Sequence, residues 1–176
     1  EIISNTIPSG RLSKSHGSDP LPTHPLEGIT VLDLSTVIAG PLAGSLVAEL
    51  GARVIRIETL AGDWMRLSNN GIASNRTMAG TEGLSIDLKT DEGQEILERL
   101  IPRVDVLMHN MRPGAPERVG IGFERARELN PSITYVYIGG YGPTGPYSHR
   151  PAMHPIGGAV SGGAITQAGR ESIPPA

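Results

Sequence analysis

Three arginine side chains have positions suited to a phosphate-bearing ligand. Arg56 lies in the second predicted strand, Arg112 follows the fourth predicted strand, and Arg118 comes shortly after it. A guanidinium group binds phosphate through paired N–H donors and also stacks on flat rings, so this residue type suits a nucleotide with several phosphates. Position alone leaves open the alternative that each arginine is an ordinary surface residue at a strand end or on a helix.

The familiar sequence motifs of catalysis are missing from this chain. It contains no G-x-S-x-G, no H-E-x-x-H and no Walker loop. Asp33, Asp87 and Asp105 fall in predicted strands, where a carboxylate more often fixes a backbone turn than attacks a substrate. His109 and His154 are candidate bases, but the sequence shows no partner that would orient either ring. We expect no metal site, because no set of residues has the spacing of metal ligands.

A strand–turn–helix–strand unit in residues 26–58 must position the first of these groups. Residues 29–34 form an apolar, β-rich run, residues 35–40 turn the chain, and Pro41 suits the first helical position. Gly51 is placed to end the helix in the left-handed conformation, and residues 53–58 return as a second strand. Such a unit is right-handed and parallel, so the turn lies at the carboxyl edge of the sheet, where ligands bind.

The first turn does not match the dinucleotide-binding fingerprint. Glu58 occupies the acidic position at the end of the second strand, but residues 39–44 lack three glycines in the required order. Pro41 also removes an N–H group that a pyrophosphate would use. The sequence therefore disfavours NAD(P).

The rest of the chain alternates between strands and helices, which predicts an α/β fold. We expect a partial, doubly wound, Rossmann-like parallel sheet of four or five strands with flanking helices. Residues 59–83 are polar and turn-rich, as in a long binding loop or a mobile connection. The remaining predicted elements are strands at 84–88, 104–108 and 133–138, a helix from the N-cap Thr90 to Ile101, and short helices at 115–119 and 123–129.

Composition divides the chain into three parts and excludes several functions. Residues 1–25 are predicted to be a flexible tail or linker, 26–150 the Rossmann-like portion, and 151–176 a glycine-rich segment leading toward a missing remainder. A net charge of −3 gives no argument for nucleic acid. The absence of cysteine fits a reducing interior, so we expect a cytoplasmic protein. No stretch predicts a membrane span, and no signal peptide is visible.

Several motifs, taken together, resemble the family III CoA-transferases, the CaiB/BaiF group, which includes α-methylacyl-CoA racemases. The resemblance runs from Leu26 to about Gly163 and covers the amino-terminal portion of a typical member. It is carried by LEGITVLDLSTVIAGPLAGSLVAELGARVIRIE, LSIDLKTDEG, VDVLMHNMRPGAPERVGIGFE, LNPSITYVYIGGYGPTGPY and RPAMHPIGGAVSGG.

The resemblance implies a Rossmann-like large domain, a small second domain, and two subunits interlocked like linked rings, or a partner chain that carries the remainder. It also implies that coenzyme A or acyl-CoA lies along the loops at the sheet edge. The residues implied to contact CoA are Val37, Ile38, Ala39, Arg56, Asn110, Met111, Arg112 and Arg118.

The chemistry implied by the resemblance is CoA transfer from an acyl-CoA to a carboxylic acid. An aspartate attacks the thioester, which gives a mixed anhydride and then an aspartyl-CoA thioester. Backbone N–H groups of a glycine-rich loop such as residues 139–145 can stabilise the oxyanion. The alignment places this aspartate shortly beyond Ala176, so the chain by itself is expected to be inactive.

Two departures from the family pattern keep an alternative open. Ala152, Met153 and His154 stand where members often carry G-[YH]-D, which leaves His154 as a weak catalytic candidate and disfavours racemase chemistry. Residues 81–83 read T-E-G where a basic K-R-S is usual, which removes positive charge from the phosphate side. The alternative is a non-catalytic CoA-transferase-like module, or half of a tandem fusion, that serves assembly.

Overall fold

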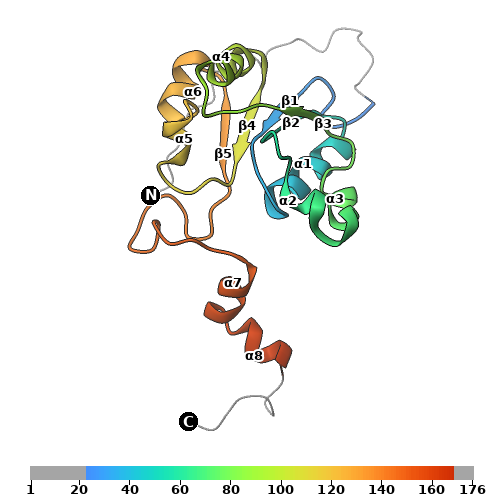
Figure 1. The fold of residues 1–176 in the computed structure, drawn as a ribbon, viewed down its shortest axis with the longest axis vertical. Coiled ribbons are helices and arrows are strands. Elements are labelled where there is room, and N and C mark those ends of the chain that lie inside the picture. Colours follow the sequence, from blue (N-terminus) through green and yellow to red (C-terminus); the bar gives the residue numbers. More distant parts are fainter. Residues whose placement is uncertain (1–22, 169–176) are drawn as a thin grey trace.

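The computed structural model describes residues 23–168, apart from the side chains of Asn69, His154, Pro155 and Ala168. The predicted tail therefore lies almost entirely outside the described residues, and the glycine-rich segment is described only to residue 168. Figure 1 shows a layered body of sheet and helices, from which α7 (His154–Val160) and α8 (Gly163–Ala168) extend away. The division of the chain into three parts stays a prediction.

A parallel five-stranded sheet in the order β3-β2-β1-β4-β5 forms the centre of the body. All neighbouring strands pair in parallel, including β1 with β2, as the sequence predicted. The expected α/β class is therefore confirmed. The strands are β1 (Thr30–Asp33), β2 (Arg53–Glu58), β3 (Glu82–Ser85), β4 (Val106–His109) and β5 (Thr134–Tyr137).

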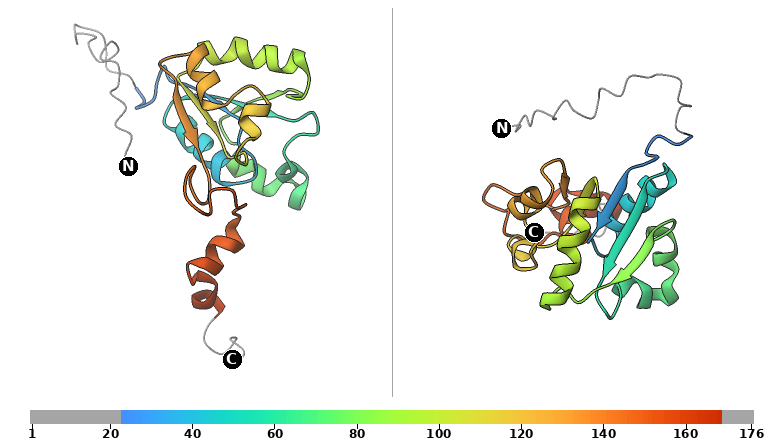
Figure 2. Two further views of the ribbon diagram at one scale, coloured as in Figure 1. Left: turned by 90° about the vertical axis from the view of Figure 1, so that its left-hand side faces the viewer. Right: turned by 90° about the horizontal axis from the view of Figure 1, so that it is seen from above.

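Helices cover both faces of the sheet (Figures 1 and 2). On one face lies α1 (Ala39–Glu49), with α2 (Trp64–Leu67), η1 (Ser68–Gly71) and α3 (Ile72–Thr77) beside it. The other face carries α4 (Asp91–Leu100), η2 (Ile101–Arg103), α5 (Ala115–Arg118) and α6 (Phe123–Leu129). No described helix is both long enough and apolar enough to cross a membrane.

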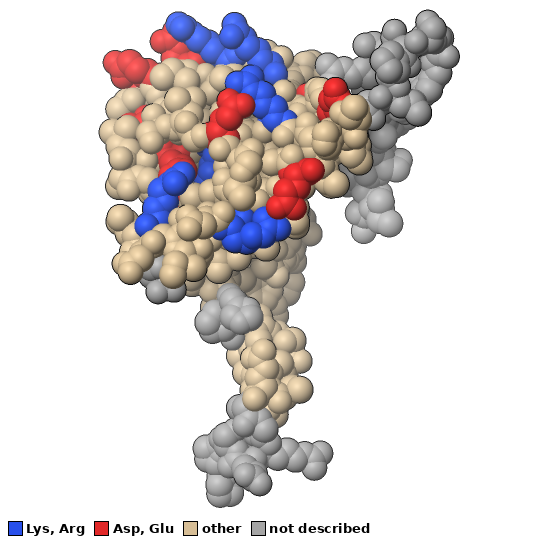
Figure 3. Space-filling view, turned by 90° about the vertical axis from the view of Figure 1, so that its right-hand side faces the viewer, with Lys and Arg blue, Asp and Glu red and all other residues tan. Residues whose placement is uncertain are grey.

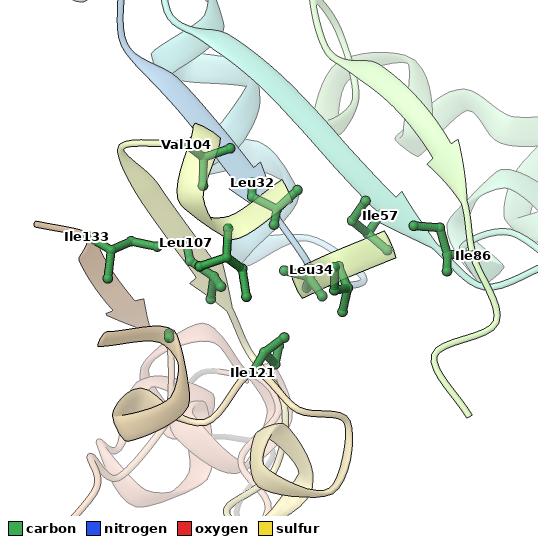
Figure 4. Packing of buried hydrophobic residues seen from close by; sticks show 11 residues of the cluster. Leu32, Leu34, Ile57, Ile86, Val104, Leu107, Ile121 and Ile133 are labelled. Carbon is green, nitrogen blue, oxygen red and sulfur yellow. The ribbon is translucent and has the colours of Figure 1, made fainter. Parts of the chain in front are cut away.

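The larger hydrophobic core fills the space between the sheet and the helices α4 and α6. Figure 4 shows Leu32, Leu107 and Ile121 turned toward one another, and all three are fully buried. A smaller cluster around Val31, Val54 and Met108 packs on the opposite face, under α1. Central strands of a parallel sheet are buried on both faces, which is why β1 and β4 read as continuous apolar runs.

Two helical segments differ from what periodicity predicted. Residues 59–83 are not an irregular connection, because they contain α2, η1 and α3. Asp63 begins α2 by accepting a hydrogen bond from the Met65 N–H over 2.9 Å, and Met65 is buried. Helix α1 begins at Ala39, two residues before Pro41. Pro41 is tolerated there because the first four N–H groups of a helix have no partner within it.

The buried faces of α1 and α4 also differ in detail from the predicted ones. Leu42, Leu46, Val47 and Leu50 repeat at helical spacing, which predicts that they face the core, but Leu46 and Leu50 are 45% and 46% exposed. Ala43, Val47 and Ala48 pack on the sheet instead, because small side chains let α1 approach it closely. The same spacing predicts Ile96, Leu97 and Ile101 on the inner face of the next long helix. Leu97 of α4 and Ile101, the first residue of η2, are buried, whereas Ile96 is exposed.

Truncating the central leucine of the core should strongly destabilise the fold. Leu107 is fully buried, so we expect Leu107→Ala to lower the free energy of unfolding by about 2–5 kcal/mol through lost contacts and a cavity. Leu67→Ala is the matched control, since that side chain is 81% exposed. Urea unfolding monitored by circular dichroism measures both. Equal losses in the two variants would contradict the described packing.

Candidate functional site

The loops that follow β1 and β4 meet at the carboxyl edge of the sheet. The strand order reverses between β1 and β4, since the chain passes from β1 to β2 on one side and later reaches β4 on the other. Open parallel sheets bind ligands at such a switch point. Two hydrogen bonds join the loops here: the Thr36 N–H donates to Asn110 Oδ1 over 2.9 Å, and Asn110 Nδ2 donates to the Thr36 carbonyl over 2.8 Å.

The turn between β1 and α1 holds a valine in the left-handed backbone region. Val37 has a φ of 73°, which crowds its branched side chain and costs on the order of 1–3 kcal/mol. The Val37 N–H donates to Asp63 Oδ2 over 3.0 Å, which ties the turn to the start of α2. Ile38 and Ala39 follow with exposed side chains. The turn therefore presents an apolar surface to solvent at the switch point.

A buried arginine lies directly behind this turn. The Arg56 side chain is 1% exposed, and its Nη2 donates to the Ser35 carbonyl over 3.2 Å. Parallel pairing of β1 with β2 sets Asp33 opposite Arg56, while Asp63 reaches back from α2. The guanidinium group is ion-paired with three buried carboxylates: Asp33 at 3.2 Å, Asp63 at 2.9 Å and Glu58 at 3.4 Å. We call Arg56, Asp33, Glu58 and Asp63 the Arg56 cluster.

Each carboxylate of the Arg56 cluster also accepts hydrogen bonds from the backbone or from a second arginine. Asp33 Oδ1 accepts from the Ser35 N–H over 2.8 Å and from the Ser35 hydroxyl. Burial raises the pKa of Asp33, while the Ser35 bonds and the Arg56 charge act in the opposite direction. Glu58 Oε2 accepts from the Asp63 N–H over 3.1 Å and from Arg66 Nε over 2.8 Å. The cluster therefore connects β1, β2 and the start of α2.

The structure places Arg56 differently from the other predicted site residues. The resemblance implied that Arg56 meets the adenosine-phosphate end of CoA, but its guanidinium group is engaged by the Arg56 cluster and buried beneath the turn. It holds the Ser35 carbonyl instead, so it positions the turn from behind. Sequence spacing did not reveal this role, because Asp33 is 23 residues from Arg56 and comes next to it only through the pairing of β1 with β2.

The remaining predicted CoA residues lie on the loops after β1 and β4, at the start of α1 and on α5. Asn110 pins the two loops through its amide group. Met111 is partly buried and follows it, while the side chains of Arg112 and Arg118 are exposed. Arg118 lies against Gly114, where a Cβ would come within 3.3 Å of Arg118 Nη1. Two cationic side chains therefore stand on the loop after β4 and on α5, open to a ligand.

His109, at the end of β4, lies beside a hollow that sequence reasoning missed. Its ring is 2% exposed, and Nδ1 accepts a hydrogen bond from the Met111 N–H over 3.2 Å. The rings of Tyr135 and Tyr137 lie 5.2 Å and 5.3 Å from it, measured between centroids. Burial lowers the pKa of His109, so the ring is neutral near pH 7. The hollow has a volume of about 240 Å³.

The other catalytic candidate gains no support from geometry. His154 begins α7, but its side chain lies outside the described residues. Met153, just before it, is 63% exposed. Among the side chains that the structure describes, no group of three His, Asp or Glu residues is arranged to hold a metal ion.

Acidic and basic side chains are interspersed on the side of the molecule shown in Figure 3. Exposed ion pairs join Arg53 to Glu82 over 2.8 Å and Arg76 to Glu49 over 2.9 Å. Neighbouring opposite charges cancel at short range, so this side offers no broad basic surface for a polyanion.

Removing the charge of Arg56 should cost far more than removing an exposed arginine. Arg56→Met leaves the buried carboxylates of the Arg56 cluster without their cation, and we expect a loss of about 3–5 kcal/mol in the free energy of unfolding. Arg53→Met is the matched control, because Arg53 lies on the same strand in an exposed ion pair and should change stability little. Urea unfolding measures both. A small loss for Arg56→Met would contradict the cluster.

Stability should also depend on pH through Glu58. The hydrogen bond from the Arg66 side chain lowers the pKa of Glu58 below its ordinary 4.5. Because the folded-state pKa is the lower one, this stabilisation is complete above the unfolded pKa and is lost as the pH falls through the folded value. Between about pH 5 and about pH 3, stability should therefore fall less steeply in Glu58→Gln than in the unsubstituted chain. Parallel pH curves from urea titrations would refute this.

Comparison with known proteins identifies the family. The family model described as CoA-transferase family III matches residues 26–176. The chain is 38% identical over 152 residues to the succinyl-CoA–D-citramalate CoA-transferase of Chloroflexus aurantiacus. This match covers 82% of this chain and 38% of that protein. It is also 38% identical over 159 residues to the formyl-CoA:oxalate CoA-transferase of Streptomyces avermitilis, with 87% and 38% covered.

Solved structures agree with the sequence relatives. The crystal structure of Rv3272 from M. tuberculosis matches with a TM-score of 0.81 at 32% identity, over 88% of this chain and 43% of that chain. A CaiB/BaiF family protein from Brucella suis matches with a TM-score of 0.73 at 31% identity, over 79% and 39%. The chain thus spans about two-fifths of the length of the curated relatives that it matches. The resemblance carried by the sequence motifs is confirmed, and the chain belongs to CoA-transferase family III.

Proposed function

We propose that this chain is the CoA-binding, amino-terminal portion of an enzyme that transfers CoA from an acyl-CoA to a carboxylic acid. The observation that carries the proposal is the joined pair of loops at the switch point, with the exposed Arg112 and Arg118 beside them. The family match supports CoA transfer in general. Two relatives are named for transfer between an acyl-CoA and a carboxylic acid, citramalate in one and oxalate in the other.

Each side chain at the switch point has a distinct proposed role in binding. The exposed Ile38 and Ala39, with Val37 behind them, offer an apolar surface to the pantetheine arm of CoA. Arg112 and Arg118 pair with its phosphates, since charge-assisted hydrogen bonds to phosphate are the strong ones. Asn110 and Met111 shape the loop after β4. Asn110 does so through its hydrogen bonds to the backbone of Thr36, in addition to any contact with the ligand.

The acyl-transfer step requires a group that lies beyond this chain. In the proposed mechanism an aspartate after Ala176, or on a partner chain, attacks the thioester carbonyl and passes through a mixed anhydride to an aspartyl-CoA thioester. Gly142 and Gly145, with φ values of 75° and 98°, keep the 139–145 loop in a conformation that can turn backbone N–H groups toward a developing oxyanion. The chain without that aspartate would bind substrate but not turn it over.

A partner or a further domain is proposed to cover part of the described surface. Large apolar side chains are exposed on α2, α3, α7 and α8, among them Leu67 at 81% and Val160 at 73%. Apolar surface of this kind marks places where other protein packs. The succinyl-CoA–L-malate CoA-transferase of Chloroflexus aurantiacus is described as having an alpha and a beta subunit. We propose an interlocked homodimer, or a partner chain, in the cytoplasm.

Loss of one exposed arginine should weaken CoA binding measurably. We expect Arg112→Ala to weaken binding by about 1–2 kcal/mol, the worth of a charge-assisted hydrogen bond. Arg99→Ala serves as the control, because Arg99 is an exposed arginine of α4 that pairs with Glu95. Isothermal titration with CoA gives both dissociation constants. An unchanged constant for Arg112→Ala would remove this residue from the proposed site.

The same titration separates an enzyme portion from a non-catalytic module. Binding of CoA and acyl-CoA to the unsubstituted protein supports the transferase proposal. Failure of both ligands to bind at millimolar concentration, in a protein whose circular dichroism shows it to be folded, would overturn it. That result would favour the alternative of a CoA-transferase-like module that serves assembly.

A further inference from the structure

The hollow beside His109 lies on the face of the sheet opposite to α1. Its walls come from the carboxyl ends of β4 and β5 and from α5 and α6, and its volume is about 240 Å³. Met111, Phe123, Tyr135 and Tyr137 give it a largely apolar and aromatic lining. The strained turn at Val37 leads instead to α1, so the hollow is separate from the surface to which we assign the pantetheine arm.

One polar group in this wall has no partner. The Met111 N–H donates to His109 Nδ1, so Nδ1 carries no proton and the hydrogen of the neutral ring is on Nε2. This Nε2–H group is buried and has no hydrogen-bond partner among the described residues. Buried donors are nearly always paired, because an unpaired one has lost its hydrogen bonds to water without a replacement. An acceptor atom entering the hollow would supply that replacement.

The lining restricts which acceptor can enter. The Tyr135 hydroxyl already donates to the Ile121 carbonyl over 3.0 Å, so it is not free to bind a ligand. Glu117 also lines the hollow and repels anions. Burying a carboxylate against apolar rings is costly without a cation inside, whereas a neutral carbonyl oxygen needs only one donor. A cavity of ~150 Å³ holds benzene, so this hollow has room for an aromatic ring with one carbonyl substituent.

We propose that the hollow is a binding site for a small neutral ligand with an apolar or aromatic body and one carbonyl oxygen, which accepts a hydrogen bond from His109 Nε2. The ring of Tyr135 lies edge-on to the imidazole and that of Tyr137 is tilted against it, which holds the imidazole in place. Phe123 packs edge-on against Tyr135 at 5.6 Å between centroids. The ligand class is therefore a free amide, ester or ketone.

Benzamide tests the site, with two substitutions that divide the functions of the two ring nitrogens. His109→Asn keeps an acceptor near Nδ1 for the Met111 N–H but has no atom near Nε2. His109→Gln places an amide group near Nε2 but loses the acceptor. We expect benzamide to bind the full 176-residue chain, to bind His109→Asn about tenfold more weakly, and to bind His109→Gln with most of its affinity. His149→Asn is the control, since that histidine is exposed.

Calorimetry gives the affinities, and side-chain nitrogen NMR of His109 should show a downfield shift of the Nε2 proton on binding. The proposal is overturned if benzamide does not bind the folded chain, if His109→Asn binds it as well as the unsubstituted chain does, or if benzoate binds more tightly than benzamide. Pantetheine is titrated in parallel, and a shift of the Nε2 proton by pantetheine but not by benzamide would likewise overturn a free-ligand site. CoA binding, measured on the same samples, tests the proposed function independently.

Discussion

The structure depends on the buried positive charge of Arg56. Four elements of local structure converge on its guanidinium group: the end of β1 through Asp33, the turn through the Ser35 carbonyl, the end of β2 through Glu58, and the start of α2 through Asp63. A buried cation is tolerated only when its partners are close and well directed. The cluster therefore fixes how the first turn leaves the sheet, and it holds Asp63 where it accepts the N–H of the strained Val37.

Two separate sets of hydrogen bonds fix the carboxyl edge, one from each side. The Arg56 cluster fixes the turn after β1 from behind, and the amide of Asn110 fixes it from the neighbouring loop after β4. Neither set of hydrogen bonds uses Arg112 or Arg118, so these exposed cations stay available to a ligand. A preformed site loses less conformational freedom when its ligand binds. The strained backbone of Val37 is the cost of turning the side chains of Ile38 and Ala39 outward.

The sequence predicted the elements better than it predicted the contacts among them. Apolar runs located β1, β2, β4 and β5, whereas β3 runs over Glu82–Ser85 rather than the predicted residues 84–88. Thr90 was recognised as the N-cap of α4, where its hydroxyl accepts from the Gly93 N–H over 3.1 Å. The role of Arg56 could not be predicted from spacing, because it requires parallel pairing to set Asp33 opposite it and α2 to bring Asp63 back. The hollow at His109 was missed for the same reason: its walls come from separate strands and helices that only the fold assembles.

We propose that the carboxyl edge between β1 and β4 holds CoA, and a crystal structure of the protein with CoA would show whether it does. We expect the pantetheine arm to lie against Val37, Ile38 and Ala39, the phosphates to lie within hydrogen-bond distance of Arg112 and Arg118, and Arg56 to stay buried. CoA bound elsewhere, or an edge filled by protein side chains with both exposed arginines turned away, would contradict it.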